Sequence, residues 1–163
     1  SLAISPTPRP PHKTRRQTSL RHRFAMLRKA FATEISSGRV CLSLLEKSLP
    51  APHYTIRTLE ALEKLTGHPP ILLVGEDMYA TLNTWHRGEE LIENYAIAVF
   101  SRNNHDPKLI KTHHLAFSGL NWPASSTAIR HAISEHRDCS ALLPAEVNSY
   151  IIKKQLYSNY DKN

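Results

Sequence analysis

The sequence is poor in cysteine and has no long apolar run. Its only cysteines, Cys41 and Cys139, are too few for a disulfide framework, so we expect a reducing, cytoplasmic setting. No apolar segment approaches the length of a membrane span and no signal peptide is evident, so a membrane protein is not expected. The 163 residues are 40% hydrophobic, which predicts a single domain over residues 1–163 with a buried core.

Metal-binding and nucleophile motifs are also missing. There is no C-x-x-C and no H-E-x-x-H, although the chain contains 10 histidines. His113 and His114 are adjacent, so in a strand their side chains face opposite ways. His131 and His136 are five apart, which is off the spacing that shares a helix face. We therefore expect no metal site, and neither a Ser-His-Asp nor a Cys-His arrangement has local support.

Acidic residues are absent from the first 33 positions. That segment holds eight bases, and the remaining 130 residues carry 13 bases against 14 acids, so the net charge of +7 is concentrated at one end. A local basic excess predicts contact with a polyanion, either a nucleic acid or the phosphates of a nucleotide. The eight bases are Arg9, Lys13, Arg15, Arg16, Arg21, Arg23, Arg28 and Lys29.

Short apolar runs alternate with segments of helical periodicity. The pattern predicts strands over residues 2–4, 40–45, 71–74, 96–100 and 115–117, and helices over residues 19–35, 54–66, 85–94, 125–136 and 145–156. Ser19 is the expected N-cap of the first helix, and Gly67 the expected C-terminal cap of the second. Strands that alternate with helices indicate an α/β fold, with a parallel sheet that carries helices on both faces and has right-handed crossovers. In such sheets ligands bind at the carboxyl ends of the strands.

The stretch from Trp122 to Arg130 is typical of a helix start that binds an anion. A proline is followed by Ser125, Ser126 and Thr127, whose hydroxyls can join the free backbone amides of a first helical turn. Arg130 comes one turn later, where its planar guanidinium can grip a phosphate. The alternative is an ordinary capped surface helix.

Other candidates follow the predicted strands and helix starts. Asp77 is placed to accept hydrogen bonds from a ribose or, alternatively, to cap a helix, and Trp85 can stack on a heterocycle or belong to the core. Thr55 opens a helix and can present its backbone amide to a carboxylate or merely cap that helix. His12 and Lys13 end a proline-rich loop, where they can meet phosphate or simply be solvated.

Six groups of residues also occur together in the order of one known family. They are Pro10–Lys13; His22–Arg23 with Met26–Leu27; Tyr54–Ile56 with Thr58–Leu59; Gly75 with Asp77, Leu82 and Trp85–His86; Ser125–Thr127 with Ile129–Arg130; and Leu143–Pro144 with Val147 and Tyr150–Ile151. In these segments the chain resembles the bacterial nicotinate-nucleotide adenylyltransferases, of the nucleotidyltransferase superfamily, and the resemblance implies that superfamily's Rossmann-like fold. The match covers nearly the whole chain.

The resemblance implies transfer of AMP from ATP to nicotinate mononucleotide, giving deamido-NAD and pyrophosphate with Mg²⁺ bound to the ATP. It also implies site residues. The catalytic residues would be Lys13 and Arg130. ATP would be bound by His12, Ser125, Ser126, Thr127, Arg130 and Asp77, and the nicotinate nucleotide by Thr55, Trp85 and His86. It implies no membrane or nucleic-acid partner, and leaves open whether the chain forms a homo-oligomer.

The sequence departs from the family at its beginning. The family's G-x-F-x-P-x-H-x-G-H signature, in its first strand and helix, has no counterpart here, and the chain starts at Ser1. We therefore expect that a βα unit precedes Ser1 in a longer enzyme. Smaller departures are Arg57 where the family usually has Asp, Glu76 where a small residue is usual, and Ala124 where Ile is common.

Two other functions are compatible with the sequence. A catalytically inactive paralogue would lack the histidine signature yet keep Ser125–Arg130 for nucleotide binding. A basic nucleic-acid-binding protein would use residues 9–29 and bind in a salt-sensitive way. The latter leaves Asp77, Trp85 and the Ser-Ser-Thr helix start unexplained.

Overall fold

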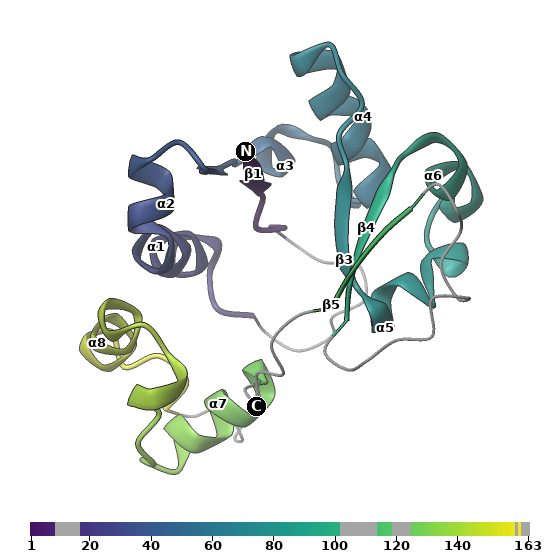
Figure 1. Ribbon diagram of the computed structural model, residues 1–163. Coiled ribbons are helices and arrows are strands. Elements are labelled where there is room, and N and C mark those ends of the chain that lie inside the picture. The colour runs from purple at the N-terminus through teal and green to yellow at the C-terminus, as the bar shows by residue number, and fades with distance from the viewer. Residues whose placement is uncertain (9–16, 102–113, 119–124, 159, 161–163) are drawn as a thin grey trace. The chain divides into compact units, whose positions relative to one another are not determined.

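The computed structural model describes residues 1–8, 17–101, 114–118, 125–158 and 160 (Figure 1). The chain forms two compact units. Unit 1 combines Ser1–Pro52 with Pro123–Asn163, and unit 2 is the continuous segment His53–Trp122. Both contain parallel strands connected by helices, as the α/β pattern predicts. The expectation of one domain over residues 1–163 stays a prediction.

Unit 1 begins with a short parallel sheet. Strand β1 (Leu2–Ile4) pairs with β2 (Val40–Leu42), with Leu2 opposite Val40. The sequence predicts a strand through residue 45, which is too long. The Ser43 hydroxyl accepts a hydrogen bond from the Leu45 backbone amide at 3.1 Å, and helix α3 (Leu45–Ser48) begins there. A serine side chain that bonds two residues ahead favours a turn over a strand.

The crossover between these strands is a broken helix. Helix α1 (Leu20–Ala30) starts at Ser19, whose side chain accepts from the His22 amide, which confirms Ser19 as the N-cap. The predicted helix over residues 19–35 is interrupted at Phe31, where φ is −114°, and α2 (Ala32–Ser36) follows. The apolar spacing continues across the break through Phe31 and Ile35, and both side chains are partly buried. Spacing alone therefore could not reveal it.

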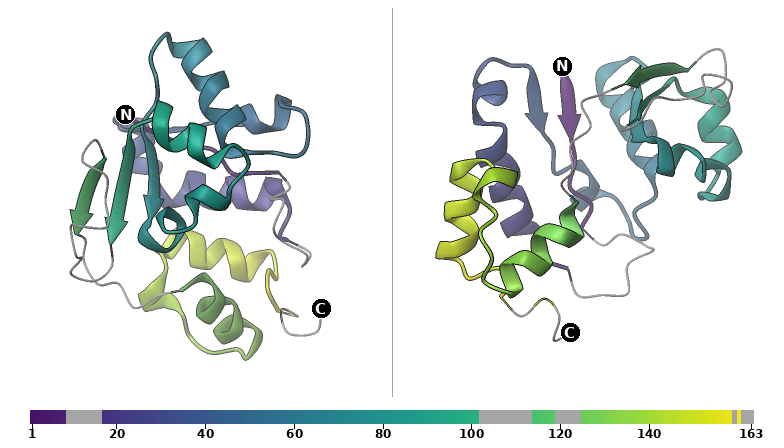
Figure 2. Two further views of the ribbon diagram at one scale, coloured as in Figure 1. Left: turned by 90° about the vertical axis from the view of Figure 1, so that its right-hand side faces the viewer. Right: turned by 60° about the horizontal axis from the view of Figure 1, so that its bottom comes forward.

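The C-terminal part of unit 1 is helical. It consists of α7 (Ser126–Ser134), the 3₁₀ turn η3 (Ser140–Leu142) and α8 (Ala145–Lys153). Helix α8 lies beside α1 (Figure 2), and the His22 ring shares a 2.9 Å hydrogen bond with the Tyr150 hydroxyl. Both helices end before the predicted residues 136 and 156. After α8 the backbone turns through Gln155 (φ 49°) and Tyr157 (φ 68°), which no helix can include.

Unit 2 is a three-stranded parallel sheet covered by helices. Its strands, in the order β3-β4-β5, are Leu72–Gly75, Ile97–Ser101 and Leu115–Ser118. The helices are α4 (Thr55–Thr66), α5 (Glu76–Tyr79), the 3₁₀ turn η1 (Leu82–Thr84) and α6 (Gly88–Asn94). In the left view of Figure 2 these helices lie on one side of the three strands. The short α5 and η1 were not predicted.

Helix α4 begins and ends as its sequence predicts. Its inner face buries Ile56 and Leu59. Gly67 closes it in the left-handed conformation (φ 74°) and donates its amide to the Glu63 carbonyl at 2.8 Å.

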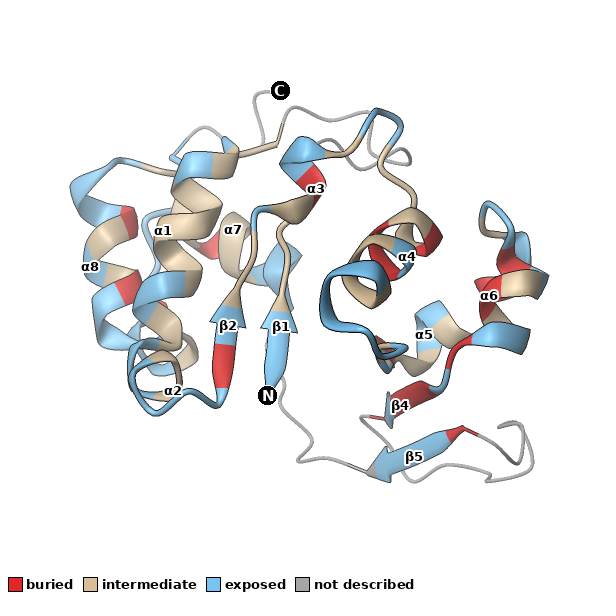
Figure 3. Cartoon of the chain, turned by 90° about the horizontal axis from the view of Figure 1, so that it is seen from above, coloured by how far each residue is buried: buried red, intermediate tan, exposed pale blue. Residues whose placement is uncertain are grey.

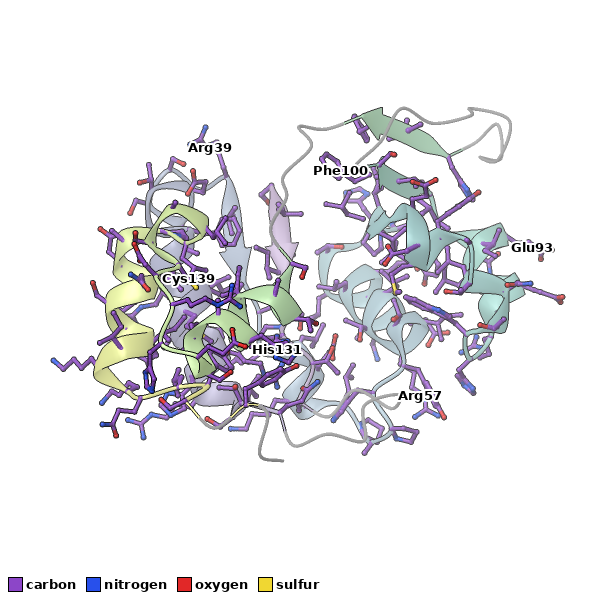
Figure 4. The ribbon with its side chains drawn as sticks, turned by 90° about the horizontal axis from the view of Figure 1, so that it is seen from below. Arg39, Arg57, Glu93, Phe100, His131 and Cys139 are labelled. Atoms are coloured by element: carbon purple, nitrogen blue, oxygen red, sulfur yellow. The ribbon has the colours of Figure 1, made fainter. Side chains whose placement is uncertain are left out.

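Alternation along the strands separates a buried face from an exposed one. Val74, Ile97 and Val99 enter the core with Leu82 and Leu91, whose side chains are fully buried. The apolar residues of the other sheet face, Leu73, Phe100, Leu115 and Phe117, are exposed. Figure 3 shows β5 in the colour of exposed residues, and Figure 4 labels the Phe100 side chain. No helix in the described part of the chain is long and apolar enough to cross a bilayer.

Candidate functional site

The start of α4 meets the loop after η1 through two stacked rings. Tyr54, the N-cap residue of α4, lies face to face with His86, with ring centroids 3.9 Å apart and planes at 17°. Thr55 is the first residue of the same helix. The Tyr54 side chain makes no capping hydrogen bond. The stack therefore brings His86 to the helix start at which Thr55 can present its amide.

Arg57 extends this cluster. Its guanidinium carbon lies 5.4 Å from the centroid of the Tyr54 ring, within cation–π range, and Figure 4 marks its side chain at the start of α4. No acidic residue occupies the first turn of this helix. Arg57 and the positive end of the helix dipole therefore both favour an anion here. The departure from the family pattern at position 57 thus adds positive charge next to Thr55.

The loop carrying Trp85 and His86 is held from both ends. The predicted helix over residues 85–94 begins only at Gly88, because Arg87 is left-handed (φ 54°). Trp85 donates its amide to the Leu82 carbonyl at 3.0 Å, and Gly88 donates to the Trp85 carbonyl at 2.9 Å. Trp85 itself is half-buried against the core cluster. It therefore contributes to the core and also retains exposed surface.

Arg87 clamps the same loop to two helices. Its guanidinium reaches Glu60 of α4 at 2.8 Å, and its Nε lies 2.7 Å from an oxygen of Glu90 in α6. The hydrogen bond with Glu90, followed by that with Glu60, raises the pKa of Arg87 above its already high value. The bond from Arg87 also lowers the pKa of the Glu90 carboxyl. Ion pairs this exposed stabilise the fold by little, so their effect is to orient the loop.

Two glycines allow close contacts in this region, one with backbone and one with a side chain. At Gly88, a Cβ atom would overlap the Leu82 carbonyl oxygen, so any side chain there would push α6 away from η1. At Gly75, a Cβ atom would lie 2.7 Å from Oδ1 of Asp77. The Asp77 carboxylate therefore rests against the turn that ends β3.

Asp77 lies where sequence reasoning expects it, just beyond a strand end. It is exposed in the first turn of α5, and the N-cap position is Gly75, not Asp77. Its neighbour Glu76 accepts a hydrogen bond from the buried Ser101 hydroxyl at 3.2 Å. Glu76, which stands where the family usually has a small residue, thus links the carboxyl ends of β3 and β4 through this hydrogen bond.

The second group of candidates lies in unit 1, at the start of α7. Ser125 is the N-cap, and its hydroxyl accepts from the Ala128 amide at 3.1 Å, so the capping alternative holds for Ser125. Ser126 and Thr127 are exposed in the first turn. Arg130 is half-buried one turn later, and its guanidinium carbon lies 5.6 Å from the centroids of both Tyr157 and Tyr160.

His12 and Lys13 lie outside the described residues. The loop leading toward them is anchored by Arg23 of α1. Its Nε donates to the Thr18 carbonyl at 3.0 Å, and its Nη2 donates to the carbonyls of Thr7 at 2.8 Å and Pro8 at 3.3 Å. In the sequence Arg23 is notable only as part of the family motif with His22. The structure gives it the function of fixing the start of the proline-rich segment.

Sequence reasoning identified several residues of each local cluster and missed some of their neighbours. The missed residues are of two kinds. Tyr54 contacts His86, and Arg87 holds the loop between η1 and α6. The other two, Tyr157 and Tyr160, contact Arg130. Tyr54 could have been found from the sequence, because it is an aromatic residue directly before Thr55. The tyrosines near the C-terminus carried no such signal. Within the described residues, no three His, Cys, Asp or Glu side chains are grouped as metal ligands would be.

Comparison with known proteins covers both units. A family model described as cytidylyltransferase-like matches residues 2–132. The protein named probable nicotinate-nucleotide adenylyltransferase of Prosthecochloris aestuarii is 31% identical over 160 residues, spanning 91% of this chain and 79% of that protein. The protein of the same name from Pseudomonas putida strain KT2440 is 32% identical over 181 residues, spanning 96% and 76%.

Solved structures share the fold. The nicotinic acid mononucleotide adenylyltransferase of Plasmodium falciparum, complexed with NaAD, superposes with a TM-score of 0.74 at 19% identity, covering 96% of this chain and 82% of that one. A second structure of the Plasmodium protein, complexed with APC, gives 0.67 at 20% identity, covering 86% and 77%. These similarities confirm the Rossmann-like α/β fold.

Proposed function

The chain belongs to the cytidylyltransferase-like family and, within it, to the nicotinate-nucleotide adenylyltransferases, and we propose that it transfers AMP from ATP to nicotinate mononucleotide. The products are deamido-NAD and pyrophosphate. One observation carries the proposal: the exposed first turn of α7, with Ser126 and Thr127, followed one turn later by Arg130. Amides, hydroxyls and a guanidinium at one helix start suit a phosphate chain.

The reaction is an in-line displacement at phosphorus. An oxygen of the mononucleotide phosphate forms a bond to the α-phosphorus of ATP, and the bond from that phosphorus to the bridging oxygen of pyrophosphate breaks. Pyrophosphate leaves with the electron pair. Such transfers depend on positioning and on neutralising charge more than on covalent participation by the protein.

The family resemblance implies candidate contacts for ATP within each unit taken by itself. In unit 1, Ser126, Thr127 and Arg130 bind the phosphates, and Ser125 orders the helix start by capping it. Lys13, with His12, contacts the phosphates as well. In unit 2, Asp77 accepts hydrogen bonds from a ribose, and its exposure supports this.

The nicotinate end is assigned to the cluster around Tyr54. The amide of Thr55 binds the carboxylate, and Trp85 and His86 frame the pyridine ring. The exposed part of Trp85 and the stacked position of His86 support these contacts. Mg²⁺ enters as part of the substrate, MgATP, and screens the triphosphate during transfer. Free Cys41 and Cys139 support a cytoplasmic setting.

The test is the formation of deamido-NAD by the wild-type chain and by Arg130→Ala, measured by chromatography. We expect turnover to fall by about 100-fold in the variant, because phosphate charge in the transition state loses its partner. Arg137→Ala is the matched control, since Arg137 follows the same helix and pairs with Glu135 at the surface. Unchanged turnover in Arg130→Ala would refute the assignment. Both forms are made as the full-length protein, and ATP binding by the full-length wild type without product would favour the inactive nucleotide-binding protein.

A further inference from the structure

We infer that Tyr157 and Tyr160 form an aromatic clamp that orients the Arg130 guanidinium toward the phosphates of ATP. The inference rests on the proposed function, in which Arg130 contacts those phosphates. It adds two positioning residues, contributed by the segment after α8. The guanidinium carbon lies at 5.6 Å from each ring centroid.

Arg130 is placed by α7 to reach the start of its own helix. It follows Ser126 by four residues and Thr127 by three, so all three share one helix face. Side chains of a helix tilt toward its N-terminus, which directs Arg130 back toward the exposed first turn. An arginine at this position has many rotamers, and only some of them reach a bound phosphate.

The two rings restrict those rotamers without using the hydrogen-bond donors. Ring contacts engage the faces of a guanidinium, whereas its five N–H groups point outward in its plane. The ion pairs of the described residues join Arg39, Arg87 and Arg137 to glutamates, and none of them involves Arg130. The two tyrosine rings therefore hold a guanidinium whose N–H donors pair with no carboxylate among the described residues. Preorganisation of this kind lowers the entropy lost when the phosphate binds.

The backbone that presents the rings is itself specific. Tyr157 adopts φ 68°, a left-handed conformation that is uncommon for an aromatic residue. It is fixed because Leu156 donates its amide to the Ile151 carbonyl at 3.0 Å and Tyr160 donates to the Tyr157 carbonyl at 3.1 Å. The Tyr160 ring also meets His131 edge-on, with centroids 5.3 Å apart and planes at 89°. His131, marked in Figure 4, directly follows Arg130 in α7. These contacts bring the rings to α7.

The test compares ring removal with ring retention in the full chain. Tyr157→Leu and Tyr160→Leu remove the aromatic faces, whereas Tyr157→Phe and Tyr160→Phe keep them. Binding of ATP and of adenosine is measured by calorimetry. We expect the leucine variants to bind ATP about three- to tenfold more weakly, to bind adenosine as the wild type does, and the phenylalanine variants to bind both normally. Ile152→Ala is the control, because Ile152 is exposed on α8.

A double-mutant cycle tests whether the tyrosines act through Arg130. In the Arg130→Ala background, Tyr157→Leu is expected to have no further effect on ATP binding. Equal ATP binding by wild-type and leucine variants would overturn the clamp and leave the proposed function standing. Tighter ATP binding by the leucine variants would also overturn it, since the rings would then obstruct Arg130. If Arg130→Ala binds ATP as the wild type does, the phosphate assignment itself fails.

An observation on the unmutated chain guards against variants that fail to fold. Protons that lie over an aromatic face are shielded, so the Arg130 side-chain resonances are expected upfield of those of Arg137. Wild-type Arg130 resonances at ordinary positions would refute the clamp. ATP binding is expected to shift the Arg130 N–H signals in the wild type.

Discussion

Tyr54 and His86 stack face to face, with 3.9 Å between their ring centroids. The contact joins the N-cap of α4 to the loop that Arg87 holds between α4 and α6. His86 is exposed, so the stack is what keeps its ring in place at this surface. Any ring that binds beside Thr55 therefore meets a partly assembled aromatic surface.

Removal of the His86 ring should affect one substrate only. We expect His86→Ala to raise KM for nicotinate mononucleotide by about three- to tenfold, because offset ring contacts contribute about 0.5–1.5 kcal/mol. KM for ATP should not change. Steady-state kinetics with each substrate varied in turn would measure both. His68→Ala is the control, since His68 is an exposed histidine in the loop after α4; an equal rise for both substrates would contradict a role at the nicotinate end.

A methyl group at position 75 should act on Asp77. In Gly75→Ala the new Cβ would lie 2.7 Å from Oδ1 of Asp77, so the carboxylate must move, whereas φ −73° and ψ 159° suit alanine. We expect folding stability close to that of the wild type and ATP affinity about tenfold lower, the size of a lost hydrogen bond to a charged group. Titration calorimetry and urea unfolding would measure the two quantities. On an Asp77→Ala background the same change should have no effect; an additional loss there would show that Gly75 acts independently.

Gly88→Ala should destabilise unit 2. Its Cβ would overlap the Leu82 carbonyl oxygen, which belongs to backbone and cannot rotate away. We expect a loss of about 1–3 kcal/mol in the free energy of unfolding, typical of an overpacked site. Gly67→Ala is the comparison, because a Cβ there meets nothing within 4 Å and the cost comes from the positive φ alone. Urea unfolding followed by circular dichroism would measure both, and a smaller loss at position 88 than at 67 would contradict the overlap.

Tyr95 should make unfolding sensitive to alkaline pH. Burial, followed by the 2.9 Å hydrogen bond to Glu63, raises the pKa of its phenol to about 12. The phenol of the unfolded chain titrates near 10. Between these values the unfolded chain releases a proton that the folded chain keeps, so this stabilisation is complete below pH 10 and is lost as the pH rises to about 12. The difference in unfolding free energy between wild type and Tyr95→Phe should therefore shrink over that interval by about 2–3 kcal/mol; a constant difference would refute the assigned pKa.

The longer elements of the fold were predictable because local chemistry determines them. Ser19 and Gly67 begin and end their helices as expected, since a cap depends on one side chain or one left-handed glycine. The break at Phe31 and the short α3, α5 and η1 were not predicted. The three short elements are each about one helical turn long, and at that length tertiary contacts outweigh intrinsic helix propensity.

The positions of the candidate site residues were predictable where the sequence places polar groups beside a helix start or a strand end. Ser126, Thr127, Arg130 and Asp77 lie at such positions. The stack of Tyr54 on His86 joins separate segments, and no local pattern contains it. The rings near Arg130 depend on a left-handed tyrosine, a conformation for which sequence patterns would favour glycine.

Unit 1 is built from both ends of the chain, and unit 2 from the stretch between them. During synthesis, unit 2 therefore has all of its residues before unit 1 has its own. The bond between His22 and Tyr150 closes a very long loop, whereas the Tyr54–His86 stack closes a much shorter one. Contacts between residues that are near in sequence form sooner. Unit 2 can therefore fold before α8 has been synthesised and can pack against α1. The half that holds Arg130 is the last to be completed.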